Sequence, residues 1–461
     1  MKYVKYLMNS TDTVTAELKA HRFSIMDWVI CLGLIFASLI VGLVHVPQHE
    51  QISPIDEFVY IDYLAKVPTE GVVERGEETG AYARQYFACH GVSMYTEAQP
   101  ALCSGSNFDE DPLYPFNGVT SADLYTPLYF GTTWFLAQPI QWAGVQDLTE
   151  AGRYVGSIWL AIALIFLFAA LRRIGISGWV GLGLGLLLAG SLPAYWSHTY
   201  VSTDATALPA GALMLYLAIV FIQTKRLGWI LIGAAAIVTL FKLQNLTAVA
   251  AVALALVVYT GVETAGRSDL RIKDRVLLGL KDSRTIVAVG AVGAGIFVQA
   301  VWTVVRSVIA IGPAPDQLVS EPIGFRALVA EMFKFFPNAV NGATAPASLG
   351  VNGVIVASLF TIVATAGVLG LLASGEKRSL GFSLATATLV VSLVAGPALA
   401  VANLATSGFY FSLPSRYGLA LVPIFVCCAA IFFSQRRWLA NCIAVSGGLA
   451  FVISLAVTGA A

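Results

Sequence analysis

Long apolar runs alternate with short polar turns along most of this chain, and this pattern predicts membrane-spanning helices. Each run has roughly the 17–25 residues that a helix needs to cross a bilayer. The pattern predicts eleven spans, at about residues 27–46, 154–171, 177–196, 205–223, 228–244, 246–261, 285–305, 349–372, 380–403, 417–434 and 437–458.

The composition supports this interpretation. Hydrophobic residues make up 57% of the 461-residue chain and charged residues 12%, and the mean hydropathy is +0.77. A soluble domain of this length does not sustain such values. The sequence therefore predicts an all-α polytopic membrane protein. Its net charge of zero gives no case for a nucleic-acid partner or for a basic domain that binds anionic lipid, so the positions of the positive charges are more informative than their sum. Membrane lipid is an expected partner.

The positive charges predict which way the chain is inserted. Segment 1–26 carries four basic residues ahead of the first span, which is too long for a signal-peptide core. We expect a signal-anchor helix with the N-terminus in the cytoplasm, because Lys and Arg concentrate in cytoplasmic turns. Eleven spans then put the C-terminus outside. The later basic turns fall inside on this scheme: Arg172 with Arg173, Lys225 with Arg226, the 267–284 cluster, Lys377 with Arg378, and Arg436 with Arg437.

This scheme divides the chain into six parts. A large first extracytoplasmic loop of short helices is expected between the first and second spans, and a second outer loop follows the seventh. Residues 125–146 are apolar, but a full crossing there would put every later basic turn outside, so we expect a hairpin or juxtamembrane helix. The parts are 1–26, the first span 27–46, the first loop 47–124, residues 125–305, the second outer loop 306–346, and the C-terminal spans 347–461.

The first loop holds two cysteines, Cys89 and Cys103. In an oxidising exterior they are expected to form a disulfide, worth about 3 kcal/mol in the chain-entropy model. The four other cysteines lie in apolar runs and are most simply small hydrophobic residues.

Polar residues at the outer ends of several spans are the candidates for chemistry. Asp56 and Glu57 follow the first span as an adjacent pair of acids, and Asp204 and Arg416 lie at the starts of later spans. For each residue alone a solvated turn is the simpler account. Asp56 and Glu57 would equally suit the cap of a surface helix, since acids favour a helix N-terminus. A functional site is favoured because all of these residues are predicted to lie at the same face of the membrane.

Several of these motifs resemble a known family. The acidic pair, the Tyr125-Thr126-Pro127-Leu128-Tyr129 segment, the Thr203-Asp204-Ala205 turn and Lys242 look like the C-type (GT-C) integral-membrane glycosyltransferases. The stretch from Ser415 to Pro423 is similar to an Arg-Tyr-x-x-x-Pro element of related bacterial polytopic proteins. The resemblance covers about the first 260 residues well and the rest loosely.

The resemblance implies an enzyme that takes a sugar from a polyprenyl-phosphate carrier at the outer face of the cell membrane. It implies Asp56 as general base, with inversion at the anomeric carbon, and Asp204 as a second acid facing the sugar or Asp56. Glu57 would orient the acceptor or hold a divalent cation; no other cofactor is expected, and no metal-ligand spacing marks the cysteines. Arg416 would bind the lipid phosphate.

Further substrate-binding positions follow from the same resemblance: Tyr125, Tyr129, Tyr417, His198 and Lys242. For His198 a plain interfacial histidine is the simpler account. Lys242 lies between two apolar runs, where an unpaired ammonium would be costly. It would lie near the carrier lipid at a helix break, or would reach water from a short outer turn.

The acceptor is expected to be a cell-envelope glycan or glycolipid, because no large soluble C-terminal domain follows the last span to recognise a protein. The sequence does not identify the sugar. The alternative function is a transporter or flippase of lipid-linked precursors, which would need polar residues in mid-span; few are present apart from Lys242, Gln244 and Asn245. A scaffold without chemistry would make Asp56, Glu57 and Asp204 dispensable.

Overall fold

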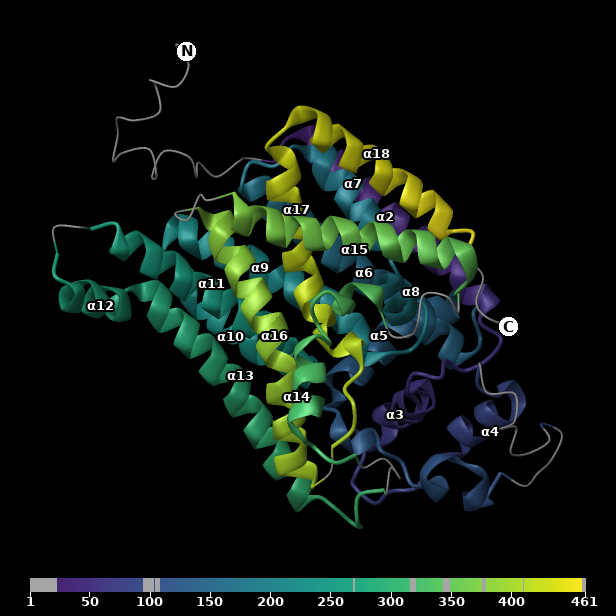
Figure 1. Ribbon diagram of the computed structural model, residues 1–461. Coiled ribbons are helices and arrows are strands. Elements are labelled where there is room, and N and C mark those ends of the chain that lie inside the picture. The colour runs from purple at the N-terminus through teal and green to yellow at the C-terminus, as the bar shows by residue number, and fades with distance from the viewer. Residues whose placement is uncertain are drawn as a thin grey trace.

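The computed structural model describes residues 23–93, 103, 108–267, 270–315, 321–342, 349–374, 379–408 and 410–457. The predicted N-terminal segment as far as residue 22, and the basic pair Lys377 and Arg378, lie outside these ranges. Within them the chain is helical, without a strand (Figure 1). The α-helices are α2 (Ile25–His45), α3 (Glu57–Glu70), α4 (Ala81–His90), α5 (Pro127–Trp142), α6 (Leu148–Arg173), α7 (Gly178–Ala189), α8 (Leu192–His198), α9 (Ala207–Thr224), α10 (Gly228–Phe241), α11 (Leu246–Ala265), α12 (Ile272–Lys281), α13 (Ser283–Val308), α14 (Phe325–Met332), α15 (Gly350–Ala373), α16 (Leu380–Ser407), α17 (Val422–Ser434) and α18 (Arg437–Ser454).

The predicted class, an all-helical multi-pass membrane protein, is confirmed. Nine helical segments in the described ranges are long and apolar enough to cross a bilayer, and the bent pair α7 and α8 makes ten if it counts as one span. The predicted count of eleven is not confirmed. The difference is the expected span 228–244, where α10 has 14 residues and stops at Lys242. The polar residues from Lys242 to Asn245 break the helix there.

Local sequence explains where the spans begin. Ser24 and Asp27 form a capping box at the start of α2, each side chain binding the other's backbone N–H. Asp147 caps α6 by accepting from the backbone N–H of Glu150 at 2.8 Å. Between α7 and α8 the axis bends by 57°, because Ser191 starts a new helix with Pro193 in its first turn.

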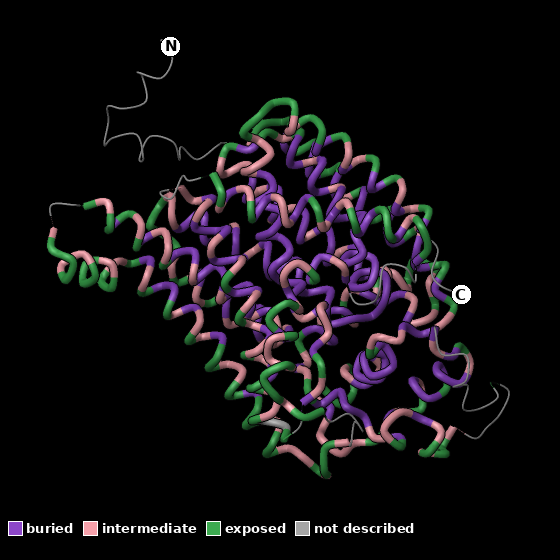
Figure 2. Tube along the Cα trace, viewed as in Figure 1, coloured by how far each residue is buried: buried purple, intermediate pink, exposed green. Residues whose placement is uncertain are grey.

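The two largest apolar cores lie in different parts of the molecule. The larger one runs through the spanning helices, including α2, α6, α9, α11 and α17, and appears as the buried centre in Figure 2. The smaller core is rich in aromatic rings and joins the first loop to α5 and α6. In it Tyr63 stacks on Phe130 with ring centroids 4.2 Å apart, and Phe58 lies against Phe87. The first loop is therefore fastened to the bundle through α5.

Residues 125–146 contain one helix, α5, rather than a hairpin. Thr126 caps it and Pro127 occupies its first position. It packs against both α3 and α6. With 16 residues it is about 24 Å long, and it is not among the described helices that meet the length and hydropathy needed for a span.

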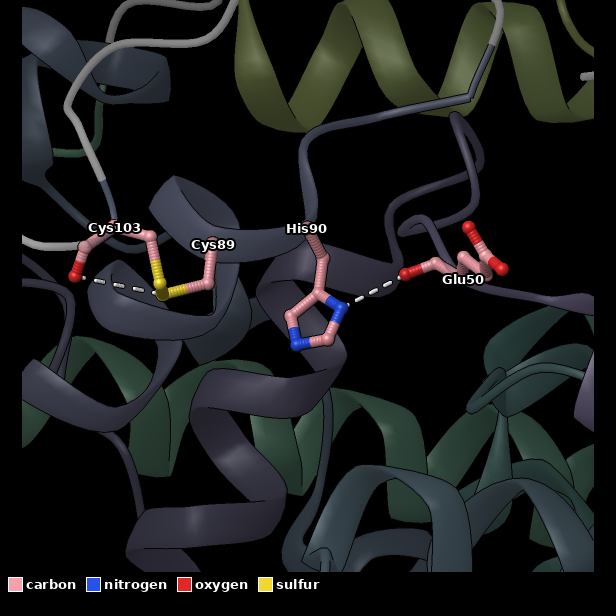
Figure 3. The surroundings of a disulfide bond; sticks show 4 residues. All are labelled: Glu50, Cys89, His90 and Cys103. Atoms are coloured by element: carbon pink, nitrogen blue, oxygen red, sulfur yellow. Dashed lines mark hydrogen bonds between the residues drawn. A yellow bond between two sulfur atoms is a disulfide. The ribbon is translucent and has the colours of Figure 1, made fainter.

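The predicted disulfide between Cys89 and Cys103 is confirmed, with the two Cα atoms 4.4 Å apart (Figure 3). The neighbouring residue His90, at the end of α4, is hydrogen-bonded through Nδ1 to the backbone oxygen of Glu50 at 2.9 Å. The disulfide joins α4 to a later residue of the first loop, and the hydrogen bond joins α4 to the start of that loop.

Three short 3₁₀ turns bring distant parts of the chain to one place. They are η5 (Thr203–Thr206) before α9, η6 (Leu243–Asn245) before α11 and η9 (Ser415–Leu421) before α17. The turn η9 contacts both η5 and η6. Because each turn opens a candidate span, these three helices begin at the same end of the bundle, and residues at their starts can meet.

Candidate functional site

Asp56 has an unusual backbone conformation. It precedes α3 with φ of 58° and ψ of 7°, the left-handed region that costs most residues energy and that Asp tolerates better than most. Its side chain makes no capping hydrogen bond to the described first turn of α3, so the predicted alternative role as a helix cap does not apply to Asp56. Instead the carboxylate turns toward η9, and 45% of the side chain is exposed.

Arg416 bridges two of the predicted acids. Its Nη2 donates to Asp56 Oδ2 at 2.6 Å and its Nη1 donates to Asp204 Oδ2 at 3.1 Å. The guanidinium is largely buried, and its planar fork allows it to hold two carboxylates at once. Arg416 lies 360 positions after Asp56 and 212 positions after Asp204 in the sequence, so a single side chain joins distant parts of the chain.

Lys242 extends this chain of charges inward. Its Nζ donates to Asp204 Oδ1 at 2.5 Å, and both side chains are almost fully buried. It lies at the break between α10 and η6, so the structure has it at a helix break, and not reaching water from a turn. We call Asp56, Asp204, Lys242 and Arg416 the Arg416 cluster. Its two acids and two bases balance, which lowers the cost of burying them.

Aromatic rings and hydroxyls surround the Arg416 cluster. The Tyr417 ring lies 5.5 Å from Arg416 Cζ and 5.8 Å from Lys242 Nζ, within the range of a cation–π contact. Tyr60 and Tyr125 have their hydroxyls 3.1 Å apart, and Thr203 donates to Tyr60 at 3.3 Å. Burial raises the pKa of both Tyr60 and Tyr125, so these phenols stay protonated and can donate hydrogen bonds.

Glu57, although adjacent to Asp56, belongs to a different set of contacts. Arg153 of α6 binds it through Nε to Oε1 at 2.8 Å and through Nη2 to Oε2 at 2.9 Å. The backbone N–H groups of Ser53 and Val201 donate to the same carboxylate at 2.7 and 2.9 Å. Glu57 is fully buried, and its oxygens already accept four hydrogen bonds.

Arg153 also fixes the chain that leads to Asp56. Its Nη1 donates to the backbone oxygen of His49 at 2.6 Å and its Nη2 to that of Gln51 at 2.9 Å. The His49 ring stacks on Tyr200 at 3.9 Å; burial, with Arg153 nearby, lowers the His49 pKa well below its usual value, so this ring is neutral. We call Glu57, Arg153, His49 and Tyr200 the Arg153 cluster.

The remaining predicted residues have different surroundings. Tyr125 contacts the hydroxyl of Tyr60, while the hydroxyl of Tyr129 accepts from the backbone N–H of Ser202 at 2.9 Å, two residues before Asp204. His198 ends α8 fully buried. The structure thus brings together Asp56, Asp204, Lys242, Arg416 and Tyr417. It places Glu57 in the Arg153 cluster and Tyr129 against the backbone that carries Asp204.

A metal site is not apparent in the part of the chain that the structure describes: no group of three or more His, Cys, Asp or Glu side chains could hold an ion there. The divalent cation that the resemblance allowed for Glu57 has no further support, because Arg153 and two backbone N–H groups occupy that carboxylate.

Five residues that complete these clusters are not among the predicted site residues: His49, Tyr60, Arg153, Tyr200 and Thr203. Tyr60 lies four positions after Asp56, one helical turn along α3, and this spacing was the available signal. Thr203 directly precedes Asp204. Arg153 lies in the first turns of an apolar span, where an arginine needs a buried acid as a partner, and Glu57 was available.

Comparison with models of known protein families gives no match for this chain, and comparison with curated proteins gives none either.

Proposed function

We propose that the protein is a membrane glycosyltransferase that moves a sugar from a polyprenyl-phosphate carrier to a hydroxyl group of a cell-envelope glycan or glycolipid. The observation that carries this proposal is the Arg416 bridge between Asp56 and Asp204, with Lys242 behind it. Asp204, Lys242 and Arg416 lie at the starts of three candidate spans and Asp56 lies at the start of α3. Together they offer charges for an anionic headgroup and a base for an acceptor hydroxyl.

The two cations suit the phosphate of the donor. Arg416 presents a planar fork that matches phosphate oxygens, and Lys242 adds a second positive charge from the interior. In the resting arrangement the fork is occupied by Asp56 and Asp204. A phosphate that enters would compete with Asp56, the more exposed of the two acids, for the guanidinium.

Asp56 is positioned to act as the general base. Of the two acids in the cluster it is the one with an exposed side chain, 45% against 4% for Asp204, so an acceptor hydroxyl can reach it. Asp56 takes the hydroxyl proton as the acceptor oxygen forms a bond to the anomeric carbon. The bond from that carbon to the phosphate oxygen breaks, and the carrier phosphate leaves with the electron pair. A single displacement of this kind inverts the anomeric carbon.

Asp204 and Tyr417 have supporting roles in this scheme. Asp204 lies between Lys242 and Arg416 and binds both, and its negative charge offsets the repulsion between these two cations. Tyr417 covers both cations with its ring. Tyr60 and Tyr125, protonated at neutral pH, supply hydroxyl donors for the sugar or acceptor. Glu57 is best described as a structural residue that positions Asp56 through the backbone.

The direct test is transfer by the purified protein in lipid nanodiscs. It is incubated with a panel of polyprenyl-phosphate sugars, with and without a cell-envelope glycan fraction as acceptor, and release of polyprenyl phosphate is followed. The proposal predicts release that requires both acceptor and one class of donor. Release without any acceptor dependence, or no release with any donor although the lipid phosphate binds, contradicts it.

A transporter or flippase of lipid-linked precursors remains the second candidate, and one observation favours it. The Arg416 cluster lies at interruptions of the helices, where η5, η6 and η9 open α9, α11 and α17, and discontinuous helices are typical of substrate sites in transporters. The same phosphate site would serve. Movement of a labelled lipid-linked sugar across proteoliposomes without loss of its sugar would favour transport over transfer.

A further inference from the structure

The helix α12 presents an apolar surface that no described part of the protein covers. Ile272, Val276 and Leu280 follow one another at intervals of four residues, and Leu277 lies beside them, so all four share one side of the helix. Their exposed fractions range from 51% for Leu277 to 76% for Ile272. A stripe of this size on an exposed helix calls for a partner.

Among the described residues, the opposite side of the helix contacts the end of α11 and the start of α13. The hydroxyl of Thr285 donates to the backbone oxygen of Gly279 at 2.7 Å, and Arg275 donates to the backbone oxygen of Ala265 in α11 at 3.5 Å. No residue of α12 is buried. In Figure 1 the helix lies at the far left, away from the body of the bundle, and Figure 2 shows it as mainly exposed.

Its position relative to the membrane follows from its neighbours. α12 connects the end of α11 to the start of α13, and both of these are candidate spans. It therefore lies where two spans leave the bilayer on one face. α11 begins beside Lys242 and has 20 residues, which amounts to about 30 Å, so this face is opposite to the Arg416 cluster.

The charges around α12 are mainly positive. Between residues 267 and 281 the sequence has five basic and two acidic residues. Of the nearby acids, Asp274 is engaged by Arg271 at 3.2 Å, and Glu263 and Asp282 are both bound by Arg284. The exposed basic residues of this face, including the turn before α10, are Lys225, Arg226, Arg267, Arg271, Lys273 and Lys281.

We propose that α12 lies in the headgroup layer of this leaflet and binds anionic phospholipids. Ile272, Val276, Leu277 and Leu280 would lie among the upper acyl chains, and Lys273 and Lys281 would contact lipid phosphates. An amphipathic helix with an apolar side and several cations, set between two spans at the depth of the interface, has the features of an interfacial helix. The attraction of each cation to an acidic leaflet adds to the burial of the apolar side.

The test uses the full-length protein in nanodiscs with a fluorescent reporter on α12. The exposed cysteine is removed by Cys442→Ala; Cys31, Cys427 and Cys428 are buried, and Cys89 and Cys103 are paired. A single cysteine then replaces either Leu280 or Leu278 and carries an environment-sensitive dye. These two leucines are two residues apart and so lie on nearly opposite sides of the helix, which makes Leu278→Cys a matched control.

The proposal predicts that the dye at Leu280→Cys is quenched by lipids carrying a spin label in the upper acyl chain. The dye at Leu278→Cys, on the side of α12 that faces the bundle, should be quenched less by these lipids. Replacing about a third of the phosphatidylcholine by phosphatidylglycerol should increase the lipid quenching at position 280. The double change Lys273→Gln and Lys281→Gln should abolish this increase while leaving the quenching in pure phosphatidylcholine.

Three results would overturn the proposal. Quenching of position 280 by iodide in the water, without quenching by the lipids, would mean that the apolar side of α12 is free in water. Shielding of position 280 that appears only at protein densities giving dimers would assign the apolar side to a second copy of the chain. Lipid quenching that does not respond to phosphatidylglycerol, or that responds equally in the double variant, would remove the anionic lipid from the account.

Discussion

Two arginine clusters lie close together in this protein and differ in how far their acidic side chains are exposed. In the Arg153 cluster the partner acid, Glu57, is fully buried and accepts four hydrogen bonds from Arg153 and the backbone. In the Arg416 cluster one partner acid, Asp56, is 45% exposed. A saturated and buried ion pair fixes the chain, whereas a bridge with one exposed end can exchange partners. Position 56 is therefore the candidate for chemistry and position 57 for structure.

The two acids, Asp56 and Glu57, are adjacent in sequence, yet each pairs with a different arginine. The left-handed backbone of Asp56 directs its carboxylate to η9 while Glu57 turns into the protein toward α6. The locked Glu57 side chain supplies contacts that maintain this unfavourable conformation, in line with the rule that strained residues persist where their surroundings over-determine them.

The largest expected effect is that of Asp56→Asn. The amide keeps the size of the side chain but cannot take a proton at neutral pH, so transfer should fall by at least about 100-fold, the usual contribution of a general base. Thermal unfolding of the detergent-solubilised protein should be nearly unchanged. Asp109→Asn, at an exposed acid of the same loop, serves as the control and should retain full activity.

Next in size is Arg416→Lys. The ammonium keeps the charge but cannot present a planar fork to two carboxylates or to a phosphate. We expect transfer to fall by about tenfold to 100-fold, mainly as a higher KM for the donor. If Arg416→Lys leaves the donor KM unchanged and lowers only kcat, the phosphate role of Arg416 is wrong.

Substitutions in the Arg153 cluster should lower the stability of the protein more than its turnover. Glu57→Gln leaves the buried Arg153 without its counter-ion, which typically costs about 3–5 kcal/mol. The thermal midpoint should drop, while turnover per folded molecule should fall far less than in Asp56→Asn. Replacing both residues, Glu57→Gln with Arg153→Gln, should recover part of the loss, because no charge is then left unpaired. A loss of turnover by Glu57→Gln at an unchanged midpoint would reverse the assignment.

The smallest expected effect is that of the disulfide. Changing Cys89 and Cys103 to Ser removes a link that closes 14 residues of the first loop, worth about 3 kcal/mol in the chain-entropy model. Neither cysteine belongs to an arginine cluster, so we expect faster proteolysis of the loop and a modest fall in midpoint. Turnover at low temperature should not change.

The sequence supports much of the fold but less of the site. Apolar runs predicted the spans and the loops, since length and hydropathy decide insertion. They could not predict that the run 228–244 stops at Lys242, or that α7 and α8 meet at 57°, because breaks depend on packing and on buried partners. The order of the spans predicted that Asp56, Asp204 and Arg416 lie at one face of the membrane. Their direct contact, and the separate partner of Glu57, depend on side-chain geometry that periodicity does not contain.

The most direct measurement of the central idea is binding of the carrier itself. Polyprenyl phosphate without a sugar, and the neutral polyprenol as a control, are titrated into the native protein and into Arg416→Lys in nanodiscs. The account predicts saturable binding of the phosphate, little binding of the alcohol, and an affinity at least about tenfold lower in the variant. Equal binding of phosphate and alcohol, or equal affinity of both proteins for the phosphate, would contradict it.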